Sequence, residues 1–239
     1  EVIEKTQAQI DKLKDLKVGM MQELLTRGVG VDGKPHTEFK NSPVGRIPKG
    51  WDVAPLSKVC DLQVGHAFKS GWFTDSGVKL LRGDNVGFGV PTWERIKCLS
   101  ENMALEYSKY RLFEGDIVIG MDRTFTKSGV KVTKLRETDL PSLLVQRVGR
   151  FLPKKTCSSD FLWQLLRSES YLNVLKNQEK GMDIPHLSKS EILEPIVAMP
   201  PLAEQKCIAS VLTSVDDNIQ RKNDKLEASK RLKKALMQD

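Results

Sequence analysis

Residues 200–239 have the sequence PPLAEQKCIASVLTSVDDNIQRKNDKLEASKRLKKALMQD, in which no glycine or proline follows Pro201. Apolar residues recur along this stretch at helical spacing, and Pro201 suits the first position of a helix. At ~1.5 Å per residue, roughly 39 residues form a rod of ~58 Å, which is too long for an ordinary surface helix. We therefore predict one long spacer helix over residues 200–239; two shorter helices with an unmarked break are the alternative. The apolar stripe expected to face a partner helix contains Val215, Ile219, Leu226 and Leu232.

The beginning of the chain predicts a second spacer helix of the same type, over residues 1–27. Its apolar stripe includes Ile10 and Leu16, and Gly28 suits the position just past a helix. The two helical segments match at an offset of 216 residues, at which Leu16-Lys17 aligns with Leu232-Lys233. This repeat indicates a unit of helix plus globular domain. Two such helices are expected to pair antiparallel, and their apolar stripes predict dimerisation through the helices.

Between the two helices the apolar pattern changes from helical spacing to short runs broken by turns. Residues 28–50 predict a linker, and residues 51–199 predict one globular domain. Within that domain we predict strands at residues 78–81, 116–119, 130–133 and 143–148. A helix is predicted from Ser158 or Ser159 to Leu175, and a shorter one follows the capping-box pair Ser188 and Glu191. The expected fold class is α+β, with mixed strands and short helices in one globular domain flanked by long coiled-coil-like helices.

Basic residues concentrate between residues 123 and 155. This stretch holds nine lysines and arginines against Glu137 and Asp139, an excess equal to the formal net charge of +7. A local field of this sign attracts phosphate. Lysines on solvated strand edges, where they discourage aggregation, explain the same pattern equally well.

No feature of the sequence indicates a membrane segment, secretion, a metal site or a catalytic centre. No apolar run approaches the ~20 residues of a membrane helix, and no signal peptide opens the chain. The four cysteines form no CxxC pair, and the three histidines are not spaced with them as metal ligands. Buried, reduced thiols of a cytoplasmic protein are the expectation. No phosphate-loop motif occurs, and Met199-Pro200-Pro201-Leu202 lacks the flanking residues that an amino-methyltransferase motif needs.

Polar and basic residues in predicted loops are candidates for contacts with DNA. Arg123 follows a predicted strand, and its guanidinium suits bidentate contact with guanine O6 and N7. Thr124, Thr126 and Lys127 lie in the same loop, from which they could reach base edges or phosphates. The further candidates are Lys69, Arg82, Asn85, Arg147 and Lys180. For these loops a plain turn, a solvated lysine or an asparagine that caps its own turn is the alternative.

Several strings along the chain resemble the specificity subunit of type I restriction–modification systems. They are MMQELLTRG (20–28), GRIPKGW (45–51), GDIVI (115–119), VQRVGR (145–150), IPHLS (184–188) and PPLAEQK (200–206). Their order and spacing carry the resemblance, which covers nearly the whole chain. It implies an α+β target-recognition domain joined to spacer helices that dock methyltransferase subunits.

The resemblance further implies sequence-specific binding of double-stranded DNA at a bipartite target, without catalysis by this chain. The implied partners are modification (methyltransferase) and restriction (translocase and endonuclease) subunits, and S-adenosylmethionine, ATP and Mg²⁺ belong to those partners. Subunits of the family have two recognition domains and this chain has one. A second recognition half is therefore expected, either in the same longer chain or through homodimerisation. The alternatives are the recognition segment of a single-chain restriction–methylation enzyme and a coiled-coil interaction protein with an incidental basic face.

Overall fold

The computed structural model describes residues 2–126, 129–179 and 186–237. The chain divides into two compact units. The first, which we call the helix unit, consists of Glu1–Asp52 and Ala198–Asp239. The second, the sheet unit, consists of Val53–Val197. Its limits lie within two residues of the range 51–199 expected for the globular domain.

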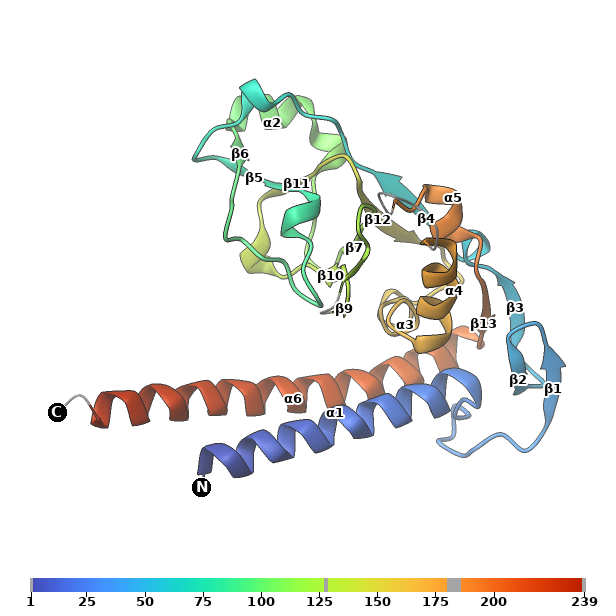
Figure 1. Ribbon diagram of the computed structural model, residues 1–239. Helices are drawn as coiled ribbons and strands as arrows, with labels where there is room; N and C mark the ends of the chain where they lie inside the picture. The colour runs from blue at the N-terminus through green and yellow to red at the C-terminus, as the bar shows by residue number, and fades with distance from the viewer. Residues whose placement is uncertain (1, 127–128, 180–185, 238–239) are drawn as a thin grey trace. The chain divides into compact units, whose positions relative to one another are not determined.

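Two long helices dominate the helix unit, α1 (Val2–Thr26) and α6 (Leu202–Leu236). They lie side by side with the beginning of α1 next to the end of α6 (Figure 1), so the expected antiparallel pairing occurs within one chain. The pairing includes hydrogen bonds from Lys17 Nζ to Asp216 and from Lys222 Nζ to Gln9. The α6 helix begins at Leu202, with Pro201 as the residue that precedes it rather than as its first residue.

The expected apolar stripe is only partly buried by this pairing. Ile10, Val215 and Leu226 are buried, and Ile219 is half-buried. Leu16 and Leu232 are exposed, at 53% and 62%. The three buried residues are covered within the chain, so the part of the stripe that still needs a partner is smaller than expected, and dimerisation through the helices stays a prediction. Leu16 and Leu232 stay available to a partner.

Residues 28–50 are not the linker that the sequence predicts. Gly28 ends α1 with a φ of +68°, as expected, but β1 (Phe39–Ser42) and β2 (Gly45–Pro48) then pair as an antiparallel hairpin. Trp51 is fully buried in the helix unit, where its indole N–H donates to Glu204 Oε2 at 2.9 Å. Glu204 also accepts from the backbone N–H of Val29 and bonds His36 Nε2. The buried carboxylate thus ties this segment to the first turn of α6.

The sheet unit contains an antiparallel four-stranded sheet and a mixed three-stranded sheet. The four-stranded sheet has the order β10 (Val132–Lys134), β7 (Ile117–Gly120), β12 (Val148–Pro153) and β4 (Cys60–Val64). The three-stranded sheet has the order β11 (Ser142–Leu144), β5 (Val78–Leu81) and β6 (Cys98–Leu99), with β11 parallel to β5. A smaller pair in this unit is β8 (Phe125–Thr126) with β9 (Gly129–Val130). The chain also pairs β3 (Asp52–Pro55) with β13 (Ile196–Met199), of which Asp52, Ala198 and Met199 are assigned to the helix unit. The fold is therefore α+β with mixed strands.

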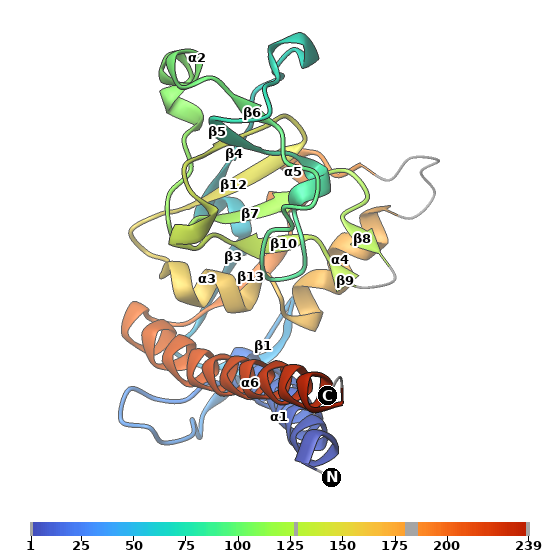
Figure 2. The ribbon, with the colours of Figure 1, turned by 90° about the vertical axis from the view of Figure 1, so that its left-hand side faces the viewer.

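Apolar residues of the two sheets form the core of the sheet unit. One cluster joins Val118 and Val148 of the four-stranded sheet to Leu81 and Leu144 of the other. A second cluster forms around Phe68, Leu80 and Leu143. Helices α3 and α4 lie on the side of the four-stranded sheet away from β5, β6 and β11 (Figures 1 and 2).

The helix expected from Ser158 to Leu175 is in fact two helices. They are α3 (Ser159–Leu165) and α4 (Glu169–Glu179). Two further short helices of the sheet unit are α2 (Glu101–Glu106) and α5 (Lys189–Leu193). Ser168 causes the break, because its hydroxyl donates to Leu165 O and accepts from the backbone N–H of Tyr171. A serine that bonds the third residue of the following helix is a typical helix start. The predicted capping box of Ser188 and Glu191 is confirmed at α5.

Two of the predicted strands are also interrupted. The strands predicted at 78–81 and 116–119 are β5 and, one residue later, β7. The predicted strand 143–148 is divided by a turn at residues 146 and 147, and the predicted strand 130–133 is divided between β9 and β10. Short 3-10 turns occupy Leu56–Lys58, Ser70–Trp72, Gly83–Asn85, Ser108–Tyr110 and Glu137–Asp139.

Candidate nucleic-acid interface

Two loops of the sheet unit meet where β7 ends and β12 begins. These strands are antiparallel neighbours, with Val148 opposite Gly120, so the end of one lies beside the start of the other. The backbone N–H of Met121 donates to Arg147 O at 2.9 Å and fixes the loop after β7 to the turn before β12. A third segment joins them, since the backbone N–H of Leu187 donates to Met121 O at 2.8 Å.

The Asp122 carboxylate connects side chains from all three segments. Its Oδ2 accepts from Arg147 Nη1 at 2.8 Å, and its Oδ1 bonds His186 Nδ1 at 2.6 Å. Partial burial of Asp122 acts to raise its pKa, but the bonds from Arg147 and His186 outweigh burial and hold the pKa below its ordinary value. Asp122 is therefore ionised at neutral pH.

Both arginines of this site have a left-handed backbone. Arg123 has a φ of +47° and Arg147 a φ of +62°; within the described residues these are the two non-glycine residues with positive φ. Such a conformation costs a residue with a side chain roughly 1–2 kcal/mol. Strained backbone of this kind gathers at functional sites, where the surrounding structure holds it in place. The coincidence of two strained arginines next to one carboxylate marks this edge as the candidate site.

The predicted loop residues differ in whether their side chains can reach a ligand. Arg123 is exposed, and no described residue forms a hydrogen bond or ion pair with its guanidinium. Thr126 is exposed as well. Thr124 is fully buried, and its hydroxyl donates to Gly120 O at 2.7 Å. The predicted contact of Thr124 with DNA is therefore wrong, because this side chain holds the turn together.

A similar correction applies to Asn85. This residue is 1% exposed, its amide donates to Thr92 O at 2.9 Å, and its Oδ1 accepts from the backbone N–H of Arg82. It stabilises its own turn, as the alternative interpretation holds, and cannot reach a base. Arg82 is half-buried, with Nη2 donating to Arg95 O at 2.9 Å.

The remaining predicted contacts lie elsewhere. Lys69 is exposed, with its Nζ 5.4 Å from the centre of the Trp72 ring, so it is available to a phosphate. Lys127 and Lys180 lie outside the described residues.

Much of the basic stretch is neutralised inside the sheet unit. Arg150 forms an ion pair with Asp116 at 2.9 Å, and its side chain is 11% exposed. Lys134 pairs with Asp160, and Arg136 pairs with Asp139. Arg147 is also paired, with Asp122, so fewer positive charges are available to an external phosphate than the sequence suggests.

Asp122 and His186 are absent from the sequence-based candidates. An aspartate directly before an arginine gives a weak signal, because acid–base neighbours are common in loops. His186 is 64 residues from Asp122, and only the fold brings the two together. His186 lies in the string IPHLS that carries the family resemblance, but no local pattern places it beside Asp122.

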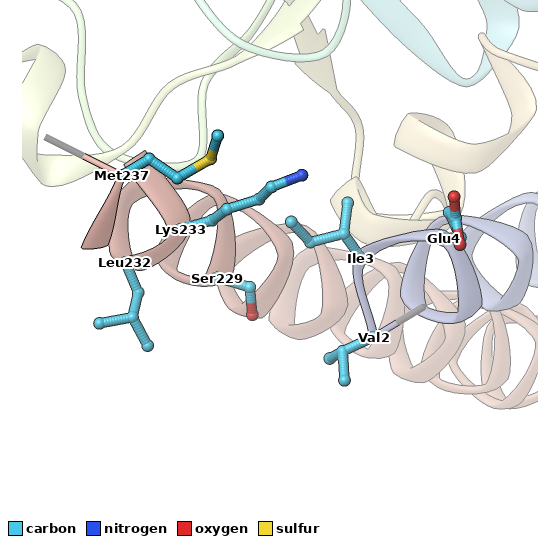
Figure 3. Close-up of a pocket in the computed structure, with 7 residues that line it drawn as sticks. All are labelled: Val2, Ile3, Glu4, Ser229, Leu232, Lys233 and Met237. Carbon is cyan, nitrogen blue, oxygen red and sulfur yellow. The ribbon is translucent and has the colours of Figure 1, made fainter. Parts of the chain in front are cut away.

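The helix unit presents a separate candidate surface. Near the beginning of α1 and the end of α6 an open groove of about 540 Å³ is lined by Val2, Ile3, Glu4, Ser229, Leu232, Lys233 and Met237. Figure 3 shows these side chains projecting from the two neighbouring helices. Val2, Leu232 and Met237 are more than half exposed. An apolar surface of this kind on a helix pair suits contact with another protein.

Neither a helix that could span a membrane nor a group of candidate metal ligands occurs in the part of the chain that the structure describes. None of its helices is long and apolar enough to cross a membrane. No group of three or more histidine, cysteine, aspartate or glutamate side chains there is arranged to hold a metal ion. Cys60, Cys98, Cys157 and Cys207 are free thiols.

Comparison with solved structures shows that the chain shares its fold with two known proteins. The chain superposes over 98% of its length on an S subunit of a type I restriction–modification system from M. genitalium, with a TM-score of 0.63 and 12% identity over 55% of that chain. An HsdS subunit from Thermoanaerobacter tengcongensis gives a TM-score of 0.59 and 19% identity, with coverage of 100% of this chain and 53% of that one.

The chain belongs to the family described as the type I restriction modification DNA specificity domain, whose sequence model matches residues 48–228. It is 38% identical over 230 residues to the specificity subunit of the type I restriction enzyme MjaVIII of Methanocaldococcus jannaschii, which covers 96% of this chain and 53% of the relative. It is 33% identical over 178 residues to the EcoAI specificity subunit of Escherichia coli, with coverage of 74% and 30%. The chain thus spans about half, or less, of the length of these relatives.

Proposed function

We propose that this chain is one target-recognition half of a type I specificity subunit, which binds double-stranded DNA and directs other subunits to a bipartite target. Membership of the DNA specificity domain family is the observation that carries the proposal. The sheet unit supplies the recognition surface, with Arg123 and Arg147 at its centre and Lys69 as a phosphate contact. The chain itself catalyses no reaction in this proposal.

The helix unit is the proposed docking site for the partner subunits. The antiparallel pair of α1 and α6 would act as the spacer, and its exposed Leu16 and Leu232 suit contact with a modification subunit. Modification subunits would bring S-adenosylmethionine, and restriction subunits would bring ATP and Mg²⁺. A second recognition half would come from a longer chain or from a second copy. The complex would act on chromosomal DNA in the cytoplasm.

Methylome sequencing tests this function directly. A host that carries the full modification enzyme is compared with the same host lacking the gene segment for this chain. We expect a bipartite methylated motif to lose one of its halves. An unchanged methylome, or methylation by the purified chain alone, contradicts the proposal.

Arg123→Ala tests the recognition surface. Because Arg123 is exposed and unpaired among the described residues, we expect a loss of affinity that is larger for the target duplex than for random DNA, by about 1–3 kcal/mol. Fluorescence anisotropy at several salt concentrations measures both affinities. An equal loss on both duplexes, with a shallower salt dependence, would assign Arg123 to a phosphate. Binding that ignores both salt and sequence would favour an interaction protein with an incidental basic face.

A further inference from the structure

The turn that contains Arg147 is held by backbone hydrogen bonds to two other segments. The backbone O of Arg147 accepts from the Met121 N–H, and the preceding Gln146 N–H donates to His66 O at 2.8 Å. The left-handed φ of +62° therefore belongs to a turn anchored by two other segments. At the far end of the side chain, Asp122 Oδ2 holds Nη1 at 2.8 Å. The arginine is fixed in position although its side chain is 65% exposed.

The second oxygen of Asp122 is also occupied. His186 Nδ1 bonds Oδ1 at 2.6 Å, so both oxygens of the carboxylate are bonded and its orientation toward the arginine is restrained. Asp122 is 28% exposed and His186 is 46% exposed. Since this carboxylate already binds two groups, its role is to support them rather than to bind a ligand by itself.

The bond to Asp122 leaves one edge of the guanidinium available. An arginine has five N–H donors in a planar fork, and a single bond from Nη1 leaves Nε and Nη2 to donate side by side. Within the described residues neither of these two atoms forms a hydrogen bond. Two parallel donors match the O6 and N7 acceptors of guanine in the major groove. Prior fixation of the side chain reduces the entropy that is lost when it binds.

We propose that Asp122 is a positioning residue that fixes Arg147 for bidentate contact with one guanine and so sets the base preference at that position of the target. This inference rests on the proposed function and assigns guanine to one named side chain. Besides positioning Arg147, the Asp122 carboxylate has a second effect. Its negative charge beside the interface repels phosphate and lowers affinity for random DNA.

Binding measurements on an Asp122 variant distinguish a positioning role of this residue from a merely structural one. Asp122→Ala is expected to lower the preference for guanine at one target position by about tenfold, within the range of a bidentate contact. The same variant is expected to raise affinity for random DNA, because a negative charge is removed. Loss of a structural residue would weaken binding to both kinds of DNA.

A double-mutant cycle tests whether Asp122 acts through Arg147. The full specificity subunit, assembled with its modification subunits, is titrated with the target duplex and with duplexes changed at each position in turn. We expect Asp122→Ala and Arg147→Ala to relax the same position, and Asp122→Ala to add less than about twofold when Arg147 is already alanine. Arg123→Ala is the matched control, since Arg123 is adjacent in sequence but not bound to Asp122, and its effect should multiply with that of Asp122→Ala.

Each result has one interpretation. Relaxation of different positions, or full multiplication of the Asp122 and Arg147 effects, overturns the inference and leaves the proposed function standing. Absence of any sequence preference in the unaltered complex contradicts the proposed function itself. If Asp122→Ala fails to fold, Asp122→Asn retains the shape of the side chain and removes its charge. The same loss of preference and gain on random DNA are expected of it, and an unchanged preference overturns the inference.

Discussion

At Gly65, just after β4, the chain passes so close to a neighbouring segment that a side chain has no room. A Cβ at this position would lie 2.3 Å from Val145 O and 2.4 Å from Val145 C. Backbone atoms cannot move aside as a flexible side chain can. The hydrogen bond from Gly65 N–H to Val148 O at 3.0 Å depends on this approach. The turn that contains Arg147 lies between Val145 and Val148 in the chain.

Gly65→Ala is therefore expected to lower the free energy of unfolding by about 1–3 kcal/mol, as overpacking does. Urea unfolding followed by tryptophan fluorescence measures the change. Gly71→Ala is the matched control, because a Cβ at Gly71 meets nothing within 4 Å and its effect should stay within about 0.5 kcal/mol. Equal stability of the two variants would contradict the close approach.

A second prediction at the residue scale concerns alkaline pH. Burial raises the pKa of the Cys60 thiol from 9.0 to about 12, so the folded protein keeps a proton that the unfolded chain loses. Between pH 9 and 12 the unfolded state binds fewer protons, and the free energy of unfolding falls as pH rises. The stability difference between the unaltered protein and Cys60→Ala should be constant below pH 9 and shrink above it. A constant difference up to pH 10.5, measured by urea unfolding, would contradict this expectation.

At the scale of elements, the ion pair of Lys17 with Asp216 contributes to the register of α1 against α6. The Lys17 side chain is 8% exposed and the Asp216 side chain is 29% exposed, so this pair is shielded from water far better than an ordinary surface pair. Removal of one partner leaves a buried charge without full compensation. The apolar stripe alone permits sliding by a helical turn, whereas a buried pair specifies one alignment.

Asp216→Asn is expected to destabilise the helix pair by about 1–3 kcal/mol, since Lys17 stays buried with a weaker partner. Thermal unfolding followed by circular dichroism reports the loss. Combining Asp216→Asn with Lys17→Met should restore part of it, because the buried charge is then absent. Glu227→Gln is the control, since its pair with Lys230 is about half exposed and should contribute less than about 0.5 kcal/mol.

At the scale of the whole molecule, different leucines of α6 serve the stability of the helix pair and its contact with a partner. Leu226 is 3% exposed, so a charge there would disrupt the pairing of α1 with α6 inside the chain. Leu232 is 62% exposed and lines the groove of Figure 3, where a charge disturbs little in the isolated protein. The two leucines belong to one sequence stripe and have different roles.

Leu232→Lys is expected to leave thermal unfolding unchanged within about 0.5 kcal/mol and to weaken association with the modification subunit or with a second copy. Sedimentation velocity with and without the modification subunit distinguishes these partners. Leu226→Lys should instead lower stability by several kcal/mol. Normal assembly of Leu232→Lys with every partner would remove the groove from the proposed docking surface.

The sequence by itself determined the features that depend on neighbours within a few residues. The periodic apolar residues predicted both long helices and their antiparallel pairing, Gly28 predicted the end of α1, and Ser188 with Glu191 predicted the cap of α5. Each of these rests on spacing along one element, where geometry is the same in every protein. The family resemblance was readable in the same way, from short strings in a fixed order.

Only the tertiary structure decided which side chains face outward and which distant residues meet. The burial of Asn85 and Thr124 follows from turns that bond back to Thr92 and Gly120. The site of Asp122, Arg147 and His186 exists because antiparallel strands bring three loops to one edge. Strand pairing joins residues far apart in the chain, and its register depends on the packing of the whole core. No local window of sequence contains that information.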